Sequence, residues 1–394
     1  MSSKEKNEYI LFFTGFTLTL FNYIITNSML LTFAKPIQKI VYYIGSILLI
    51  FKIFYSCTDT KLLIKNFILI VFLLMIDKIS GSMTLFNLFI IVMSSKNINI
   101  NKIIKYTSGV MIFTIIWHMF IYVVDDVIGI ETVENFIRNT NNGIVKRESF
   151  YFVHPNTFSA FCVWTVLMRS YLKFDRLKIL DYIFIASTAF FVYYFPNSRT
   201  DGIILIIAIM IILIYKKLSK NNKKIKKFSK ICCIIPYICL VFTIITTFLY
   251  GKNNIIYKLD KVFSGRIVCS RVIYEEYGFS MFGQKMDILQ NPKYFENYDV
   301  YDIYIDNTYT KLVFNNGIVV CGMFLYLYTK TMKNNTRSSI LIFLTILSVY
   351  GLMETTMLIP YLSFPLYFMR DYIFKDRREI GDETTYKNIT TRND

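Results

Sequence analysis

The sequence has few of the residues, and none of the short motifs, that mark common soluble enzymes. Only 18% of its 394 residues are charged, against about 25% in an ordinary soluble domain, and only two are histidine. There is no phosphate-binding Walker loop, no Rossmann glycine pattern and no Gly-x-Ser-x-Gly elbow. No Cys-x-x-Cys spacing is present either. These absences exclude the enzyme and metal-site classes that those motifs define.

Long apolar runs dominate the chain instead. Hydrophobic residues make up 54% of it and aromatic residues 17%, and the mean hydropathy is +0.44. Runs of about 20 apolar residues recur, each long enough to cross a bilayer as a helix. The runs, such as residues 203–215, are apolar on every side, whereas the strands of a membrane barrel alternate. We therefore predict an all-α, polytopic integral membrane protein with about twelve transmembrane helices.

The predicted spans lie near residues 9–30, 36–56, 62–77, 81–95, 103–124, 152–172, 178–195, 202–215, 231–250, 308–328, 339–353 and 357–374. The first run is long for a signal peptide and has no small-residue cleavage site, so we interpret it as a span.

Basic residues set the expected orientation. The net charge of +17 would also suit a nucleic-acid partner, but the lysines cluster in short loops between spans, so no nucleic acid is expected. Eight of the fifteen residues from 216 to 230 are lysine. Because cytoplasmic loops carry an excess of Lys and Arg, we predict that both termini are cytoplasmic. A lipid or partner site in this lysine loop is the alternative to a plain topology anchor.

This orientation divides the chain into segments. They are a cytoplasmic N-terminus (1–8), helices 1–9 (9–250, with an outer loop at 125–151 and the basic cytoplasmic loop at 216–230), a large extracytoplasmic loop (251–307), helices 10–12 (308–374) and a cytoplasmic tail (375–394).

Four polar clusters stand at the predicted outer ends of spans, and they begin at His154, Asn197, Asp306 and Glu354. The spans that follow run from outside to inside, so their helix N-termini point outward. Free N–H groups and the positive end of the helix dipole suit an anion there. The alternative is that these residues only cap helices. The candidate substrate-binding residues are His154, Asn156, Asn197, Ser198 and Asn307.

Four arginines lie on the outer side, against the orientation rule: Arg147, Arg199, Arg266 and Arg271. A guanidinium binds phosphate through two hydrogen bonds and keeps its proton near neutral pH. We therefore predict that the cluster holds a lipid-linked phosphate or pyrophosphate. Ordinary salt bridges are the alternative, with Asp201, Glu275 or Glu276 as partners. For Arg271, a pair with Glu275 four residues on is the preferred reading.

Acid–base candidates are few. Asp306 and Glu354 are carboxylates at the proposed site, and either is a candidate general base if burial raises its pKa. His154 is a candidate for binding or activating a hydroxyl, whereas His118, inside a predicted span, is expected to make a buried contact between helices. The nearby acids Asp299 and Asp302 could hold a divalent metal with Asp306, but a solvated acidic loop is commoner. We expect no metal and no cofactor.

The long outer loop, 251–307, contains one predicted helix. Apolar residues at 267, 268, 272 and 273 predict an amphipathic helix near 266–277 that lies on the outer surface. Because the loop ends at Asp306-Asn307, we interpret it as a lid over the site.

Four motifs carry a resemblance to a known family. They are Phe152-Val153-His154-Pro155-Asn156-Thr157; Asn197-Ser198-Arg199-Thr200; Ser264-Gly265-Arg266, followed by Phe282-Gly283; and Asp306-Asn307-Thr308-Tyr309, with Gly317 further on. In this order the chain resembles the O-antigen ligase/polymerase superfamily, and within it the Wzy-type polymerases of capsular and exopolysaccharide synthesis. The resemblance covers residues from about 150 to 370.

The resemblance implies a metal-independent glycosyltransferase with a GT-C-like helical fold in the bacterial cytoplasmic membrane. The donor would be a growing glycan on undecaprenyl pyrophosphate, and the acceptor the next lipid-linked repeat unit. Arg199 and Arg266 match the arginines expected to stabilise the leaving pyrophosphate. Flippase and chain-length regulator proteins are the partners implied. Related ligases usually carry His at the position of Asp306, a departure that favours a polymerase and leaves the base open.

Two other functions stay open at this stage. A lipid-linked oligosaccharide flippase also has about twelve spans, but it is expected to carry charge inside a central cavity and to have short outer loops. A ligase-like glycan transferase would use the same pyrophosphate site.

Overall fold

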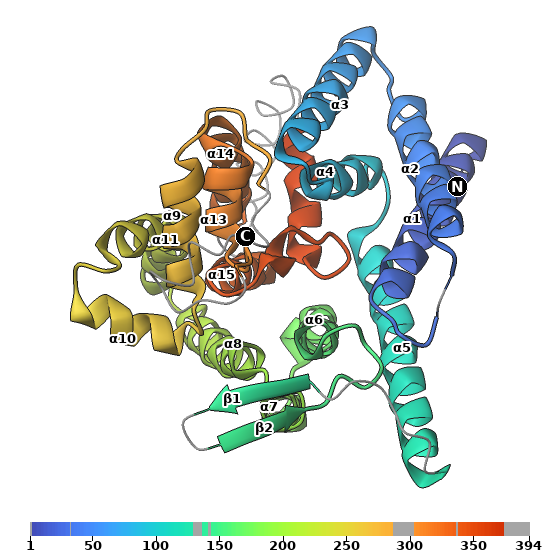
Figure 1. Cartoon of the computed structure of the whole chain (residues 1–394). Helices are drawn as coiled ribbons and strands as arrows, with labels where there is room; N and C mark the ends of the chain where they lie inside the picture. Colours follow the sequence, from blue (N-terminus) through green and yellow to red (C-terminus); the bar gives the residue numbers. More distant parts are fainter. Residues whose placement is uncertain are drawn as a thin grey trace.

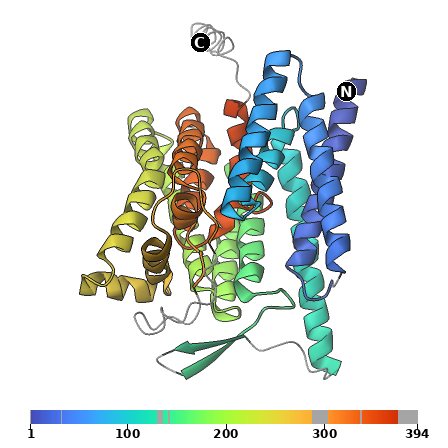
Figure 2. The ribbon, with the colours of Figure 1, turned by 45° about the horizontal axis from the view of Figure 1, so that its top comes forward.

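The computed structural model describes residues 2–31, 33–128, 136–140, 143–286, 303–335 and 338–373. Helices account for most of these residues, as predicted. Most of the helices run side by side along one direction, and a two-stranded hairpin lies at the end of the molecule away from the N-terminus (Figure 2).

The α-helices are α1 (Ser3–Thr26), α2 (Lys35–Tyr55), α3 (Thr60–Ser80), α4 (Thr84–Ser94), α5 (Ile100–Ile128), α6 (Pro155–Leu172), α7 (Ile179–Tyr194), α8 (Arg199–Leu218), α9 (Asn222–Leu249), α10 (Asn254–Val262), α11 (Arg266–Tyr277), α13 (Thr308–Thr310), α14 (Ile318–Asn334), α15 (Ser339–Tyr350) and α16 (Arg370–Ile373). The 3-10 helices are η1 (Phe174–Arg176), η3 (Thr355–Leu358) and η4 (Phe364–Met369), and η2 (Lys311–Asn315) is a π-helix. The strands are β1 (Phe136–Thr140) and β2 (Gly143–Arg147).

Local sequence explains several helix boundaries. The Ser2 hydroxyl accepts a hydrogen bond from the Glu5 N–H at 3.2 Å, and the Glu5 carboxylate accepts one from the Ser2 N–H at 2.7 Å. This reciprocal capping box starts α1. Proline at the first position of α6 costs no hydrogen bond, since that N–H has no partner inside the helix.

Helices α6 and α15 lie at the centre of the molecule (Figure 1). Almost every residue of α15 is buried, including Leu344 and Leu347, and Trp164 of α6 is fully buried. By contrast α2, α5 and α7 expose large apolar side chains such as Ile47, Phe113 and Phe190. Apolar side chains exposed along helices of this length suit a lipid environment.

The membrane prediction holds in its coarse form. Within the described residues, four helices are long and apolar enough to cross a membrane: α1, α2, α5 and α9. Three shorter apolar helices, α4, α7 and α15, have 10–17 residues. Helix α1 approaches α2 so closely that a Cβ added to Gly45 would lie only 2.7 Å from the Thr19 Cγ2, and glycine at this position permits the contact.

Two expected spans are not continuous α-helices. Between 308 and 328 the chain turns from α13 into the π-helix η2 and breaks before α14 starts at Ile318. Between 357 and 373 it forms η3, η4 and the short α16, joined by turns. Both segments are apolar, so hydropathy alone could not reveal these breaks, which depend on backbone partners from elsewhere in the chain.

Part of the long outer loop fills the first break. The Ile318 N–H donates to the Ser280 carbonyl at 2.9 Å, and the Gln284 N–H donates to the Asn315 carbonyl at 3.0 Å. Gly317 has φ +97°, and a Cβ there would lie 2.4 Å from the Gly283 nitrogen. Only glycine fits this close crossing of two backbones. The segment 278–286 is thus hydrogen-bonded to the backbone at this break, while its side chains Phe279, Met281 and Phe282 stay exposed.

The helix predicted at 266–277 exists as α11, but it does not lie on the surface. Its residues Ile267, Val268, Val272 and Ile273 are buried, and it packs on α9. The surface helix is α10 instead, which exposes Ile255, Tyr257 and Val262 and lies across the direction of α9 (Figure 1). A short amphipathic helix has the same pattern of apolar residues whether it packs against other helices or lies on a membrane surface. Only its packing partner, here α9, shows which of the two it is.

The first predicted outer loop, 125–151, contains an element that hydropathy did not predict. Strands β1 and β2 pair antiparallel with Phe136 opposite Arg147. The prediction that 251–307 acts as a lid falls partly outside the described residues, since these omit 287–302. The cytoplasmic tail from 375 onward lies outside them as well.

Candidate functional site

A cavity of about 650 Å3 lies where the motif segments meet. It is lined by side chains from the end of α1, the hairpin, the start of α6, the 264–266 turn, the 304–306 segment and the η3 region. These residues are Tyr23, Asn27, Ile137, Arg147, His154, Asn156, Thr157, Ala160, Ser264, Arg266, Tyr304, Asp306, Glu354, Thr355, Thr356 and Ile359. Six of the predicted site residues therefore share one cavity, although they come from distant parts of the sequence: Arg147, His154, Asn156, Arg266, Asp306 and Glu354.

Arg266 is the centre of the charged groups. Its Nη2 donates to the Glu354 Oε1 at 2.8 Å and lies 3.3 Å from the Asp306 Oδ2. Its Nη1 donates to the Phe263 carbonyl at 3.2 Å, and its Nε donates to the Met353 carbonyl. The side chain is 7% exposed. In this arrangement the guanidinium pairs with two carboxylates. The sequence analysis weighed salt bridges for this group of arginines, but with Asp201, Glu275 or Glu276 as partners and not with Asp306 and Glu354.

The two carboxylates sit in different environments. Burial raises the pKa of Glu354 to about 8, opposed mainly by the charge of Arg266. Burial also raises the pKa of Asp306, again opposed by Arg266. The Asp306 side chain is 29% exposed and that of Glu354 only 10%. Burial disfavours the charged form of a carboxyl, so Glu354 holds its proton the more firmly of the two.

Arg147 ties the hairpin to the start of α6. Its Nε donates to the Pro196 carbonyl at 2.9 Å, and its Nη2 donates to the Asn156 Oδ1 at 2.5 Å. Arg147 is buried, yet it lines the cavity. His154 is the N-cap of α6, and its Nδ1 accepts from the Asn156 N–H at 3.1 Å. The capping alternative therefore applies to His154, but its ring also faces the cavity lining.

The 307–310 turn joins the site to the helix core. The Asn307 Oδ1 accepts from the N–H groups of Tyr309 and Thr310 at 2.7 and 3.1 Å, and its Nδ2 donates to the Thr243 hydroxyl at 3.2 Å. The Thr308 hydroxyl donates to the Glu354 carbonyl at 2.6 Å. Asn307 is not among the residues that line the cavity. Its contacts are those of a cap that fixes the backbone beside Asp306.

The Asn197-Ser198-Arg199 segment lies outside the cavity lining. The Ser198 hydroxyl donates to the buried Asp201 Oδ2 at 2.7 Å, and the Tyr350 hydroxyl donates to the Asp201 Oδ1 at 2.8 Å. Arg199 is exposed at the start of α8. This geometry gives no support to a direct substrate contact by Arg199. It shows instead a network from α8 to α15 that sequence reasoning missed, because only the fold brings Tyr350 to Asp201.

Arg271 is also outside the cavity lining. Its Nη2 lies 2.7 Å from the Glu275 Oε1, one helical turn away, and its guanidinium lies over the Tyr274 ring. The preferred local interpretation of Arg271 is therefore confirmed.

Backbone strain gathers around the same segments. Among the described residues, five non-glycine residues have positive φ. Two of them, Phe150 and Tyr151, directly precede the first motif, and two others, Asn197 and Ser264, begin motifs. Residues held in this sparsely populated region cluster at functional sites, where surrounding contacts enforce them. No signal in the sequence indicates these conformations.

His118 makes the buried contact that was predicted. Its Nε2 is 2.7 Å from the Ser28 hydroxyl, and its Nδ1 is 2.8 Å from the Thr114 carbonyl. Asp299 and Asp302, the acids considered for a metal with Asp306, lie outside the described residues. Within the residues that the structure does describe, no group of three or more His, Cys, Asp or Glu side chains is arranged so that it could hold a metal ion.

The fold and the cavity define the chain as a helical protein that has helices long and apolar enough to cross a membrane and a charged cavity at one end of the molecule. Comparison with protein-family models, with curated proteins and with solved structures found no match.

Proposed function

We propose that the protein is a polysaccharide polymerase of the bacterial cytoplasmic membrane. It would join undecaprenyl-pyrophosphate-linked repeat units into capsule, exopolysaccharide or O-antigen on the outer face, in a GT-C-like arrangement of about twelve spans. The observation that carries the proposal is the shared cavity, in which two arginines and two carboxylates from four separate segments meet. No nucleotide or metal motif accompanies them in the sequence.

The charged groups suit glycosyl transfer from a pyrophosphate donor. An acceptor hydroxyl oxygen attacks the anomeric carbon of the donor sugar, and the bond from that carbon to the pyrophosphate oxygen breaks. The hydroxyl proton passes to a carboxylate, and the lipid pyrophosphate leaves with the bonding electrons. Fixed positive charge near the leaving group stabilises the charge that develops on it.

Asp306 is the better candidate for the general base. Two carboxylates in unlike environments take unlike roles, because the more buried one stays protonated. Glu354 is the more buried and holds its proton to about pH 8. Asp306 is partly exposed toward the cavity, within reach of an incoming hydroxyl.

The leaving pyrophosphate would contact Arg147 and Arg266. Arg266 already forms ion pairs with two carboxylates. It would therefore both orient Asp306 and stabilise the negative charge of the donor phosphate. Arg147 reaches the same cavity from the hairpin side. Guanidinium groups at two sides of one opening suit a bridging anion with several oxygens.

Deletion of the gene in its own host tests the proposal. The expected result is loss of long polymer, while single repeat units are still made and displayed on the outer face. Repeat units trapped on the inner face would indicate a flippase and refute the polymerase. Normal polymer that fails to reach its final lipid or protein acceptor would indicate a ligase.

Site variants test the assignment of residues. Asp306→Asn should lower polymer formation by about a hundred-fold or more, as loss of a general base commonly does. Arg266→Lys should lower it by a similar factor, because it removes the two-pronged positive group that would stabilise the leaving pyrophosphate. Arg271→Lys is the matched control, since Arg271 pairs with Glu275 on its own helix α11 and does not line the cavity. Full-length polymer from normally expressed Asp306→Asn would overturn the base assignment.

A further inference from the structure

A second cavity, of about 750 Å3, lies at the other end of α6. It is lined mainly by the chain from the end of α6, through η1, to the start of α7, together with Asn101 of α5 and Ser339 of α15. The other lining residues are Tyr171, Leu172, Lys173, Phe174, Asp175, Arg176, Lys178 and Asp181. Since α6 has 18 residues, this basic pocket lies about 27 Å along the helix axis from the cavity of the proposed site. The proposed function does not use it.

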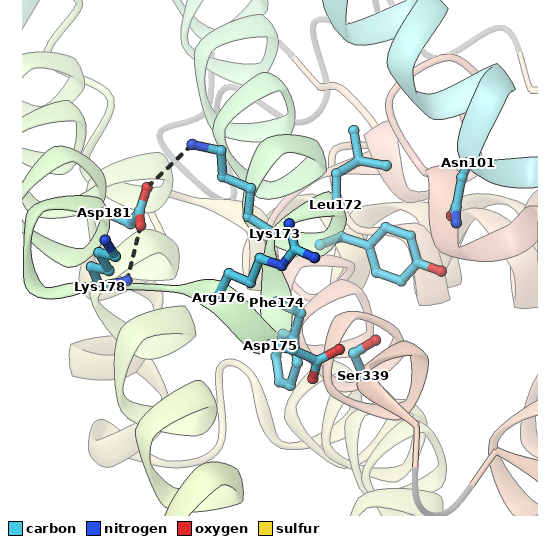
Figure 3. A pocket seen from close by; sticks show the side chains of 10 residues that line it. Asn101, Leu172, Lys173, Phe174, Asp175, Arg176, Lys178, Asp181 and Ser339 are labelled. Carbon is cyan, nitrogen blue, oxygen red and sulfur yellow. Dashed lines mark hydrogen bonds and ion pairs between the residues drawn. The ribbon is translucent and has the colours of Figure 1, made fainter.

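Three cationic side chains border the basic pocket: Lys173, Arg176 and Lys178. Lys173 lies 4.0 Å from the Asp181 Oδ1, whereas neither Arg176 nor Lys178 has an ion-pair partner within the described residues. Figure 3 shows the Arg176 side chain extending from the turn toward Leu172, with the Asp175 carboxylate on the Ser339 side. The positive charge that Arg176 adds is therefore open to a ligand.

The electrostatic surroundings add to this charge. Lys216 at the end of α8 lies with its Nζ 5.5 Å from the Phe174 ring, beside the basic pocket. From there the chain enters the loop in which eight of fifteen residues are lysine. This face carries the strongest positive charge of the sequence, and such a face meets the anionic lipids of the cytoplasmic leaflet.

The apolar surroundings favour a lipid over a soluble phosphate. The first turns of α7 adjoin Lys178 and expose Ile179 and Leu180 by 75% and 72%, with Ile183 and Phe184 half exposed. A headgroup in the pocket would place its acyl chains along this apolar face. Basic pockets between transmembrane helices on the cytoplasmic side recognise anionic headgroups in this manner.

We propose that the pocket formed by Lys173, Arg176 and Lys178 binds the phosphodiester headgroup of an anionic phospholipid, with the acyl chains lying on the first turns of α7. The site is separate from the proposed catalytic cavity, so lipid binding here stands or fails independently of glycosyl transfer.

The test is a titration of the purified full chain in a neutral detergent. Short-chain phosphatidylglycerol, phosphatidylcholine and glycerol phosphate are added separately, and bound lipid is counted by native mass spectrometry. We expect saturable binding of phosphatidylglycerol. The variant Lys173→Gln/Arg176→Gln/Lys178→Gln should bind it at least about ten-fold more weakly, since each basic residue near the surface contributes about five-fold.

The matched control is Lys223→Gln/Lys224→Gln/Lys226→Gln. It removes the same charge from exposed positions at the start of α9, outside the pocket. Equal loss of binding in both triple variants would mean general surface attraction and would overturn the proposal. Equally tight binding of phosphatidylcholine, or of glycerol phosphate without acyl chains, would overturn it as well. The single variant Arg176→Gln repeats the comparison should the triple variant fail to fold.

Discussion

Glu354 should make the stability of this protein depend on pH in an unusual direction. Its pKa lies near 8 in the folded chain, against an ordinary value of 4.5. Between these values the folded state binds more protons than the unfolded state, so the free energy of unfolding falls as pH rises. The contribution is fully present below pH 4.5 and is lost as the pH passes 8. The whole change is on the order of 5 kcal/mol.

Glu354→Gln isolates this effect. The amide keeps an oxygen that accepts from Arg266 but has no proton to lose, so the variant should lack the decline between pH 5 and 8.5. Above pH 8 it should be as stable as the wild-type chain or more stable. Thermal unfolding in detergent at stepped pH measures this. The control is Glu275→Gln, at an exposed acid paired with Arg271, which should leave the pH dependence almost unchanged.

A parallel pH slope in the wild type and in Glu354→Gln would refute the reasoning. It would mean that Glu354 ionises near its ordinary value, and that the pair with Arg266 outweighs the cost of burial. Glu354 would then be charged at neutral pH, and the reason for preferring Asp306 over Glu354 as the general base would fail with it.

Three further predictions follow from the packing. Gly317→Ala should destabilise the chain by at least about 2 kcal/mol in thermal unfolding, because of its positive φ and the backbone 2.4 Å from the new Cβ. Asp77→Leu should cost about 1–3 kcal/mol, since it leaves the buried N–H of Phe86, which donates to the Asp77 Oδ2 at 2.6 Å, without an acceptor, whereas Asp77→Asn, which keeps an acceptor oxygen, should cost less. Arg199→Ala should retain polymer formation in the deletion host and Arg147→Ala should lose it, because only Arg147 lines the cavity; the opposite ranking would return Arg199 to the site.

The membrane-facing parts of the fold are the parts that composition predicts well. Lipid leaves backbone groups no partner, so a run such as α9 must close its own hydrogen bonds as a helix. The same argument places α1, α2 and α5. Charged and capping residues at helix ends, such as His154 and Asn307, were also found from the sequence, because caps follow local rules.

The broken segments follow no local rule. The π-helix η2 and the gap before α14 exist because the 278–286 segment supplies hydrogen bonds to them from another part of the chain. The hairpin β1–β2 likewise depends on pairing between strands and not on the hydropathy of either strand. Hydrophobic patterns describe what is buried, and they carry no information on which buried backbone groups find partners across the fold.

The sequence by itself determined that this is a helical membrane protein, and it picked out most of the charged residues that meet in the cavity. Only the tertiary structure decided how those charges are paired. It placed Arg266 against Asp306 and Glu354, 40 and 88 residues away, and left Arg199 exposed at the start of α8. The physical reason is that a residue's type fixes its charge, whereas its burial and its partners, and hence its pKa and its role, depend on which segments the packed helices bring together.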